Sequence, residues 1–314
     1  MPTTPTTQSA SAKPCVIAFM NQKGGVGKTT TVVNVAAALA LSGQRILVID
    51  MDPQAHATLH LGHDPASLQA SVYDTLSDPR LIDETLIESR PNLWLLPSEV
   101  DLAGAEIELA SADDRHDRLR RAIGRIADRF DLVLIDCPPS LGMLTLNALA
   151  VADTVIVPMQ AHFLALQGVS KLLETVQLMA LQVNPGLTIA GVALCMHDEQ
   201  TTHGKEVVAD LESFFAQATH DQTPWGGGCV FRPGIRRNIK LAESPSFGQT
   251  IFEYAPTAPG AKDYAELAQV IHRTVAKTFG IKSATTPTAA AVKETETVIL
   301  VQTAEKSKAG IASP

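Results

Sequence analysis

The chain has 314 residues, of which 45% are apolar and 18% are charged, so it can bury a full hydrophobic core and is not a disordered polyelectrolyte. The formal net charge is −8, so no global positive field draws the protein to nucleic acid or to anionic lipid. Any such contact has to use a local patch of basic residues.

Short apolar runs alternate with segments of helical period along most of the chain, which indicates βαβ units and a parallel sheet. The apolar runs predict strands at residues 15–20, 45–49, 93–96, 132–135, 154–157 and 188–194. Helices are predicted at residues 29–41, 114–130, 141–151, 166–183, 205–218 and 261–279. Because the strands are almost entirely apolar, we expect an α/β fold with a mostly parallel, twisted sheet and helices on both faces.

The remaining segments differ in composition from this pattern. Residues 1–14 and 283–314 are rich in Thr, Ser, Pro and Ala or are polar, and both are expected to be disordered tails around one folded domain at 15–282. Residues 222–259 are rich in Gly, Pro, Arg and Ser without periodicity, which predicts a functional loop or a set of short elements. The four cysteines form no CxxC pair, and no apolar stretch reaches the length of a membrane helix, so a reducing cytoplasm is expected.

A glycine-rich loop follows the first predicted strand, where NQKGGVGKTT (residues 21–30) leads directly into a helical pattern. A strand, a glycine loop and a helix in this order aim backbone N–H groups and a helix N-terminus at phosphates. In such a loop Lys28 reaches the β and γ phosphates, and the hydroxyl of Thr29 is placed for Mg²⁺. The nucleotide-binding residues predicted here are Gly24, Gly25, Val26, Gly27, Lys28, Thr29 and Thr30.

The loop departs from the common pattern G-x-x-x-x-G-K-[ST], because Gln22 stands at the first glycine and a second lysine, Lys23, follows it. The run KGGVGKTT resembles the deviant Walker A motif of the ParA/MinD class of P-loop ATPases. With VIDMDPQ (48–54), IDCPPSLG (135–142) and TLNAL (145–149), the chain is similar to the ParA/Soj chromosome and plasmid partitioning ATPases over roughly residues 15 to 280. The resemblance implies a SIMIBI-like P-loop NTPase fold, ATPase activity, and ATP and Mg²⁺ as cofactors.

The resemblance also implies a set of partners. In that family ATP is held in a sandwich dimer and the extra lysine crosses to the partner's phosphates, so Lys23 is expected to be nucleotide-binding and, with Lys28, catalytic. A second cation is useful where charge builds up on the transferred γ-phosphoryl group. The implied partners are a second copy in an ATP-dependent homodimer, non-specific double-stranded DNA, and a ParB-like centromere-binding protein. We therefore expect a cytoplasmic, nucleoid-associated protein without stable membrane association.

Three carboxylates follow apolar runs and complete the predicted site. Asp50 and Asp52 follow the second predicted strand, and Asp136 follows the fourth. Carboxylates at the carboxyl ends of parallel strands face the crevice in which α/β proteins bind ligands. Asp136 is expected to hold Mg²⁺ through water, beside Thr29. The resemblance assigns to Asp52 the catalytic task of orienting the attacking water, with Asp50 behind it.

Basic residues gather in the aperiodic segment 222–259. The run RNIKLAESPSFG (237–248) is similar to a ParA/Soj stretch that reads roughly PRNVRLSEAPSHG, whose second basic residue belongs to a patch that binds DNA without sequence preference. The resemblance gives this place to Lys240 and sets Asn238 near the nucleotide. Relatives often have Arg where Gln200 stands, and Lys205 is the candidate to compensate. The predicted DNA-binding residues are Arg236, Arg237, Lys240 and Lys205.

Other functions in the same superfamily remain open on the sequence. A MinD-like membrane-cycling division-site ATPase ends in a basic amphipathic helix, whereas residues 283–314 contain Pro287 and charges of mixed sign. An electron-transferring ATPase like the nitrogenase iron protein holds an iron–sulfur cluster with cysteines, and the motifs around them are missing here. A ParA-like ATPase that positions a protein cargo fits the same motifs as a DNA-partitioning one.

Overall fold

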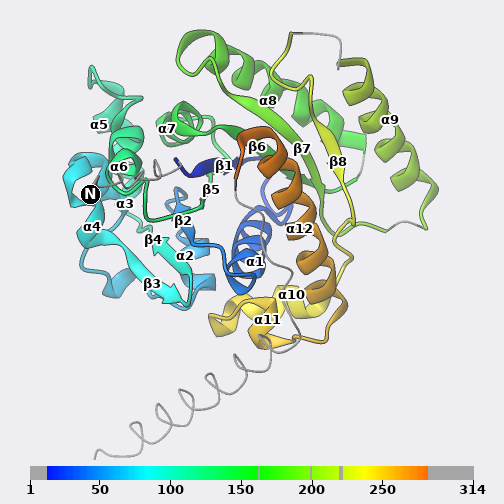
Figure 1. Ribbon diagram of the computed structural model, residues 1–314, viewed down its shortest axis with the longest axis horizontal. Helices are drawn as coiled ribbons and strands as arrows, with labels where there is room; N and C mark the ends of the chain where they lie inside the picture. The colour runs from blue at the N-terminus through cyan, green and yellow to red at the C-terminus, as the bar shows by residue number, and fades with distance from the viewer. Residues whose placement is uncertain (1–12, 162, 199, 219–221, 282–314) are drawn as a thin grey trace, which may run out of the picture.

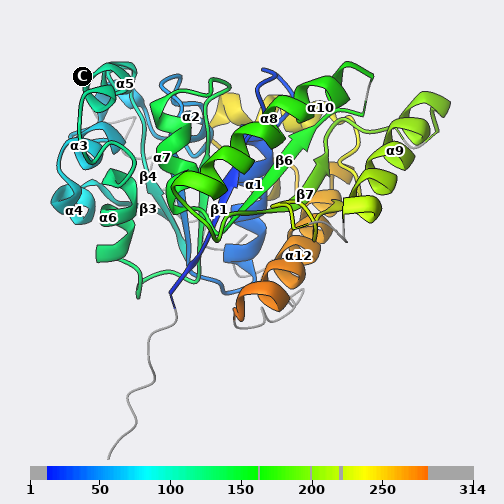
Figure 2. The same cartoon turned by 90° about the horizontal axis from the view of Figure 1, so that it is seen from above.

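The computed structural model describes residues 13–161, 163–198, 200–218 and 222–281, and these form one twisted sheet between two layers of helices (Figures 1 and 2). The predicted tails fall outside the described residues, apart from Lys13 and Pro14. The strand order is β3-β4-β2-β5-β1-β6-β7-β8, and every neighbouring pair is parallel except β3 with β4. The predicted α/β class with a mostly parallel sheet is confirmed.

The central strands end together at one edge of the sheet. The strands are β1 (Cys15–Phe19), β2 (Ile46–Asp50), β3 (Ile87–Arg90), β4 (Leu93–Leu96), β5 (Leu132–Asp136), β6 (Thr154–Met159), β7 (Thr188–Leu194) and β8 (Cys229–Phe231). In the register of β5 with its two neighbours, Asp136 lies opposite Asp50 of β2 and Phe19 of β1. The carboxyl ends of β1, β2 and β5 therefore bring the glycine loop and the acidic residues together.

Helices cover both faces of this sheet. The longer ones are α1 (Lys28–Leu41), α5 (Leu102–Ala110), α6 (Arg118–Arg125), α7 (Met143–Val151), α8 (Phe163–Gln182), α9 (Thr202–Ala218) and α12 (Pro259–Phe279). Shorter helical elements are α2 (His56–His60), η1 (Pro65–Ser67), α3 (Val72–Ser77), η2 (Pro79–Leu81), α4 (Ile82–Thr85), α10 (Ile239–Glu243), η3 (Ser244–Phe247) and α11 (Ile251–Tyr254). Among the helices that the structure describes, none is long and apolar enough to cross a membrane.

Two hydrophobic cores lie on opposite faces of the sheet, as the alternation of side chains along a strand requires. Val16 and Ala18 of β1 belong to the core that α3 and α5 to α9 cover. Ile17 and Phe19 belong to the core beneath α1 and α12, which lie side by side on the other face (Figure 1). The strands are long apolar runs because both faces are covered.

Several elements differ from the sequence-based expectation. The helix predicted at 114–130 is wrong in extent, because only α6 (Arg118–Arg125) is α-helical. Its flanks form i→i+3 turns instead, with Asp117 N–H donating to the Asp114 carbonyl at 2.9 Å and Arg129 N–H to the Ile126 carbonyl at 3.0 Å. The sequence does not predict strands β3 and β8 or helix α5. The aperiodic segment resolves into β8, α10, η3 and α11.

Gly191 in β7 provides a test of the packing between the last strands. Its φ is +149°, and a Cβ at this position would lie 2.0 Å from the carbonyl oxygen of Cys229 in β8. The Gly191→Ala variant is expected to lose about 3 kcal/mol of unfolding free energy, because backbone atoms cannot yield as a flexible side chain can. Urea titration measures the loss, and Gly186→Ala, in an open turn, is the control. Equal midpoints for the two variants would contradict the prediction.

Candidate active site

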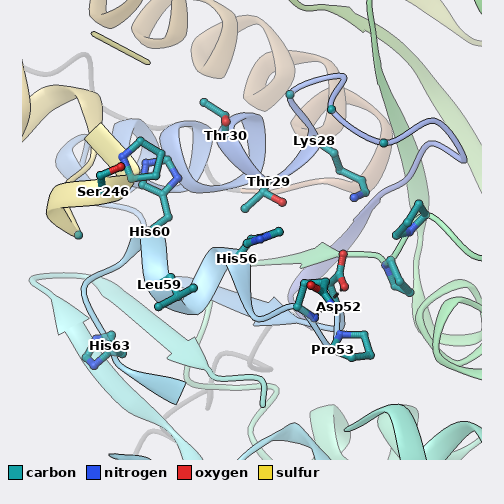
Figure 3. A pocket seen from close by; sticks show the side chains of 18 of the residues that line it. Lys28, Thr29, Thr30, Asp52, Pro53, His56, Leu59, His60, His63 and Ser246 are labelled. Carbon is teal, nitrogen blue, oxygen red and sulfur yellow. Dashed lines mark hydrogen bonds between the residues drawn. The ribbon is translucent and has the colours of Figure 1, made fainter. Parts of the chain in front are cut away.

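An open cleft of about 1250 Å³ lies at the carboxyl edge of the sheet (Figure 3). Its walls come from the glycine loop, the segment after β2, the segment after β5 and η3 with its neighbours. Small-molecule sites commonly occupy about 300–1,000 Å³, so the cleft has room for a nucleotide. The structure brings together in its wall these predicted residues: Lys23, Gly24, Gly25, Gly27, Lys28, Thr29, Thr30 and Asp52.

The glycine loop presents backbone N–H groups to the cleft. Gly27 precedes α1 with a φ of +92°, and no described side chain caps the first turn of the helix, so its N–H groups are left for a ligand. Asn21 shapes the loop, since its Nδ2 donates to the Pro158 carbonyl at 2.8 Å and its Oδ1 accepts from the Lys23 N–H at 2.9 Å. The Val26 side chain is buried and anchors the loop, so only its backbone is available to a ligand.

Lys28, Thr29 and Asp136 meet at the base of the cleft. The Thr29 hydroxyl donates to Asp136 Oδ2 at 2.6 Å, and Lys28 Nζ lies 3.9 Å from Asp136 Oδ1. Asp136 is fully buried, and its Oδ1 has no hydrogen-bond partner among the described residues. A buried carboxylate oxygen without a donor fits a water of a hydrated cation, and oxygen ligands of this kind suit Mg²⁺. Thr29 and Asp136 are the residues that would hold the metal.

Hydrogen bonds fix the turn that carries Asp52. Asp50 accepts from the N–H and the hydroxyl of Thr58, both at 2.8 Å, and from the Asp52 N–H at 3.2 Å. The Ser98 hydroxyl donates to the Asp52 carbonyl at 2.7 Å, and Asp52 Oδ1 accepts from the Gln54 N–H at 3.0 Å. The Asp52 side chain points into the cleft, near Lys28 and Thr29 (Figure 3). Asp50 therefore lies behind Asp52 and positions it, as its place in the motif predicts.

Burial at the strand ends raises the pKa of both carboxylates, Asp50 and Asp136. Burial and the neighbouring charge of Asp136 raise the pKa of Asp50 to about 7. Burial also raises the pKa of Asp136, while the charge of Lys28 and the hydrogen bond from Thr29 oppose that rise. A cation bound at this edge would favour the ionised form of both carboxylates. The electrostatics of the site thus fit a divalent metal beside a phosphate.

Two elements form one wall of the cleft: α2, with His56, Leu59 and His60, and η3, with Ser246 and Phe247 (Figure 3). The resemblance places the run 237–248 near the nucleotide, whereas nothing in the sequence marks α2. The sequence favours ordinary surface or core roles for these histidines, and no motif marks them as part of a site. Burial, followed by the charge of Arg90, lowers the pKa of His60 to about 4, so its ring is neutral. No group of three His, Cys, Asp or Glu within the described ranges could hold a metal ion.

The predicted DNA-binding residues do not line the cleft. Arg236 forms a two-pronged ion pair with Asp263 of α12, with a shortest N–O distance of 2.6 Å. Lys240 Nζ donates to Glu243 Oε2 at 2.8 Å, and Asn238 Oδ1 accepts from the Lys240 N–H at 2.9 Å. Asn238 thus begins α10 as its N-cap, and it is absent from the cleft wall as described. Its contact with a nucleotide stays a prediction.

Arg237 and Lys205 lie on the surface of neighbouring segments. Arg237 is exposed next to Arg236, whose backbone forms a parallel bridge with His197. Gly204, beside the exposed Lys205, lies against the same His197. The start of α9 and the start of α10 are therefore linked through one histidine. A DNA-binding role for these residues stays a prediction.

The fold and the glycine loop define a P-loop ATPase of the deviant Walker A class, and comparisons with known proteins agree. A family model described as an AAA domain matches residues 15–189. The chain is 42% identical to the sporulation initiation inhibitor protein Soj of Bacillus subtilis, over 82% of this chain and 97% of that protein. It is 44% identical to the chromosome-partitioning ATPase Soj of Thermus thermophilus, over 81% of this chain and 94% of that protein.

A solved structure shares the fold. A crystal structure of cobyrinic acid a,c-diamide synthase from Mycobacterium smegmatis, with bound ADP and magnesium, superposes with a TM-score of 0.70 at 36% identity. The match covers 87% of this chain and 99% of that one. This chain belongs to the Soj/ParA family of partitioning ATPases.

Proposed function

We propose that this chain is a DNA-partitioning ATPase that uses ATP and Mg²⁺, forms a nucleotide sandwich dimer and moves on DNA. The observation that carries the use of ATP and Mg²⁺ is the buried Asp136, which accepts from the Thr29 hydroxyl and faces Lys28 while one of its oxygens lacks a donor among the described residues. Mg²⁺, when bound, would neutralise charge on the phosphates and on the leaving group.

The residues at the bottom of the cleft have separate roles in the proposed reaction. Lys28 and the N–H groups that begin α1 would bind the phosphates, Thr29 and Asp136 would hold the metal, and Asp52 would orient the attacking water. Asp50, Thr58 and Ser98 hold Asp52 in place, which reduces the reorganisation needed when the water attacks. Hydrolysis then yields ADP and phosphate.

Apolar residues around the cleft support dimerisation over the nucleotide. Leu59, Met196 and Phe247 are exposed and line the cleft, and Phe247 is 64% exposed. Val100 and Ile107, exposed at 71% and 79%, flank the cleft residue Ala103 before and on α5. Exposed apolar residues gathered on one face mark an interaction surface, and a second copy on this face would close the cleft. Lys23, in the cleft wall, would then reach the partner's phosphates.

The basic residues of the segment 222–259 support DNA as the surface to which the ATPase binds. The proposed cycle has an ATP-bound dimer that binds DNA through Arg237, Lys240 and their neighbours, and a ParB-like protein that stimulates hydrolysis and release. Contacts to phosphates alone give binding without sequence preference, as a partitioning ATPase on the nucleoid requires. The protein would then reside in the cytoplasm, associated with the nucleoid.

Replacing Lys240 with Glu should weaken DNA binding about equally for all sequences and leave ATP binding intact. Lys240 already shares its charge with Glu243, so the variant both removes a phosphate contact and places a second carboxylate beside Glu243. Fluorescence anisotropy with Mg²⁺ and ATPγS measures DNA affinity against salt, and the log–log slope should fall by about one unit per lost contact.

The control for this experiment is Lys171→Glu, which makes the same charge change on the outer face of α8. This variant should keep the wild-type slope. If Lys240→Glu kept wild-type affinity and slope, the DNA surface would lie elsewhere on the protein. If the wild type pelleted with anionic liposomes rather than binding DNA, a membrane-cycling function of the MinD kind would replace the proposal.

A further inference from the structure

The segment after α2 contacts the segment 222–259, which carries the basic residues, through two glycines. Gly62 follows α2 and Gly248 follows η3, with φ values of +84° and +62°. A Cβ on Gly248 would lie 2.6 Å from the Cα of Gly62, and a Cβ on Gly62 would lie 3.0 Å from the Gly248 carbonyl oxygen. The two backbones are therefore in direct contact, and neither position accepts a side chain without a shift of the chain.

Arg90 of β3 fastens this contact. Its Nη1 donates to the Leu61 carbonyl at 2.6 Å, and its Nη2 donates to the Gly248 carbonyl at 2.9 Å. The same guanidinium forms a two-pronged ion pair with Glu253 of α11, at 2.9 and 3.1 Å. Both side chains are less than one-fifth exposed. A guanidinium that bonds carbonyls of two chain segments at once holds them in a fixed relation.

The two segments that Arg90 joins belong to the two sites of the proposed cycle, the ATP site and the DNA-binding surface. On one side, α2 follows the Asp52 turn directly, and Thr58 of α2 donates two hydrogen bonds to Asp50. On the other side, Gly248 closes η3, which continues α10 with Lys240 and packs against α2. If ATP binding rearranged the Asp52 turn, α2 would shift with it, and the bonds of Arg90 to the Leu61 and Gly248 carbonyls would pass that shift through η3 to α10.

We propose that Arg90 is a positioning residue that couples the ATP site to the DNA-binding segment through the Leu61, Gly248 and Glu253 contacts. This inference rests on the proposed ATP- and DNA-dependent cycle. Arg90 is not part of the cleft wall and is not one of the proposed DNA-binding residues, so its loss should separate the two activities. Coupling energies between such sites commonly correspond to about 5–150-fold in affinity, and the expected loss lies in that range.

Hydrogen exchange of the full chain, with and without Mg²⁺ and ATPγS, tests the coupling without DNA. In the wild type, nucleotide should protect both the glycine loop, residues 24–31, and α10, residues 239–243, which lies outside the cleft wall. In Arg90→Gln, protection of 24–31 should remain and the nucleotide-dependent protection of 239–243 should disappear. DNA affinity in the presence of ATPγS should fall about tenfold, with nucleotide affinity and basal hydrolysis unchanged.

Two further variants separate coupling from mere stability. Arg45→Gln breaks an ion pair with Asp131 at the opposite end of β2 and should leave both protection patterns intact. Arg90→Lys keeps the charge but loses the planar guanidinium that bonds several acceptors at once, so it should restore part of the protection at 239–243 and provides the test if Arg90→Gln does not fold. Wild-type protection of 239–243 in both Arg90 variants would overturn the proposal, as would a wild type in which nucleotide leaves 239–243 unchanged.

These outcomes are distinct from a failure of the proposed function. A wild type that shows coupled protection but binds no DNA would refute the DNA track and leave the coupling through Arg90 standing. A wild type that binds DNA equally with and without nucleotide would refute the coupling and leave the DNA surface standing.

Discussion

Replacing Lys28 with alanine should reduce nucleotide affinity by more than about 100-fold. Lys28 is only 9% exposed and lies 3.9 Å from a fully buried Asp136, a position at the base of the cleft that the exposed Lys23 does not occupy. Lys28 would make charge-assisted hydrogen bonds to the phosphates, each worth about 1.5–3 kcal/mol, and each 1.4 kcal/mol is a factor of about ten in affinity, so the loss of two such bonds exceeds about 100-fold. Isothermal titration with Mg²⁺ and ATPγS measures the loss.

The matched variant is Lys23→Ala, in the same loop but at its exposed start. Because Lys23 is expected to act on the partner's phosphates, this variant should bind nucleotide as a monomer and lose dimerisation and hydrolysis. Sedimentation velocity with and without ATP distinguishes the two. An ATP-dependent Lys23→Ala dimer with normal turnover would show that this lysine does not act across the dimer.

The sequence predicts those strands of the sheet that are continuous apolar runs. Strands β1, β2 and β5 are continuous apolar runs because both of their faces are buried, and such runs are readable without tertiary context. Strand β3 reads Ile-Glu-Ser-Arg and lies half-exposed at the antiparallel edge, where no apolar pattern is needed. The three residues of β8 are a strand only because β7 pairs with them.

In the site, too, the residues that belong to a local sequence motif are predicted, and those placed only by contacts between distant segments are not. The glycine loop is encoded in consecutive residues, and Asp136 is recognised as the polar end of an apolar run, so their meeting across 107 positions can be predicted. Ser98 has no motif around it, and its bond to the Asp52 carbonyl exists only because β4 ends beside β2. The wall formed by η3 likewise depends on the backbone contact of Gly62 with Gly248, which no local pattern announces.

Replacing Asp52 with alanine should stop hydrolysis while the ATP-bound state survives. Asp52 is 7% exposed at the cleft wall, and the Lys28, Thr29 and Asp136 contacts do not involve its side chain. The loss of a positioned carboxylate typically costs about 10²–10⁴-fold in the chemical step, and we expect a loss of that size in single-turnover hydrolysis. The dimer should then accumulate with ATP and remain on DNA.

A matched control distinguishes this chemistry from a general loss of negative charge in the cleft. Asp64 also lines the cleft, but its side chain accepts from the Ala66 N–H and caps η1, so Asp64→Ala should hydrolyse ATP within about threefold of the wild type. The contrast matters because both variants remove one carboxylate from the same wall. Of these two carboxylates, Asp52 is the one held from behind by Asp50 and Ser98, and a side chain fixed in this way is what an in-line attack by water requires. Hydrolysis by Asp52→Ala within about tenfold of the wild type would assign the water to another group.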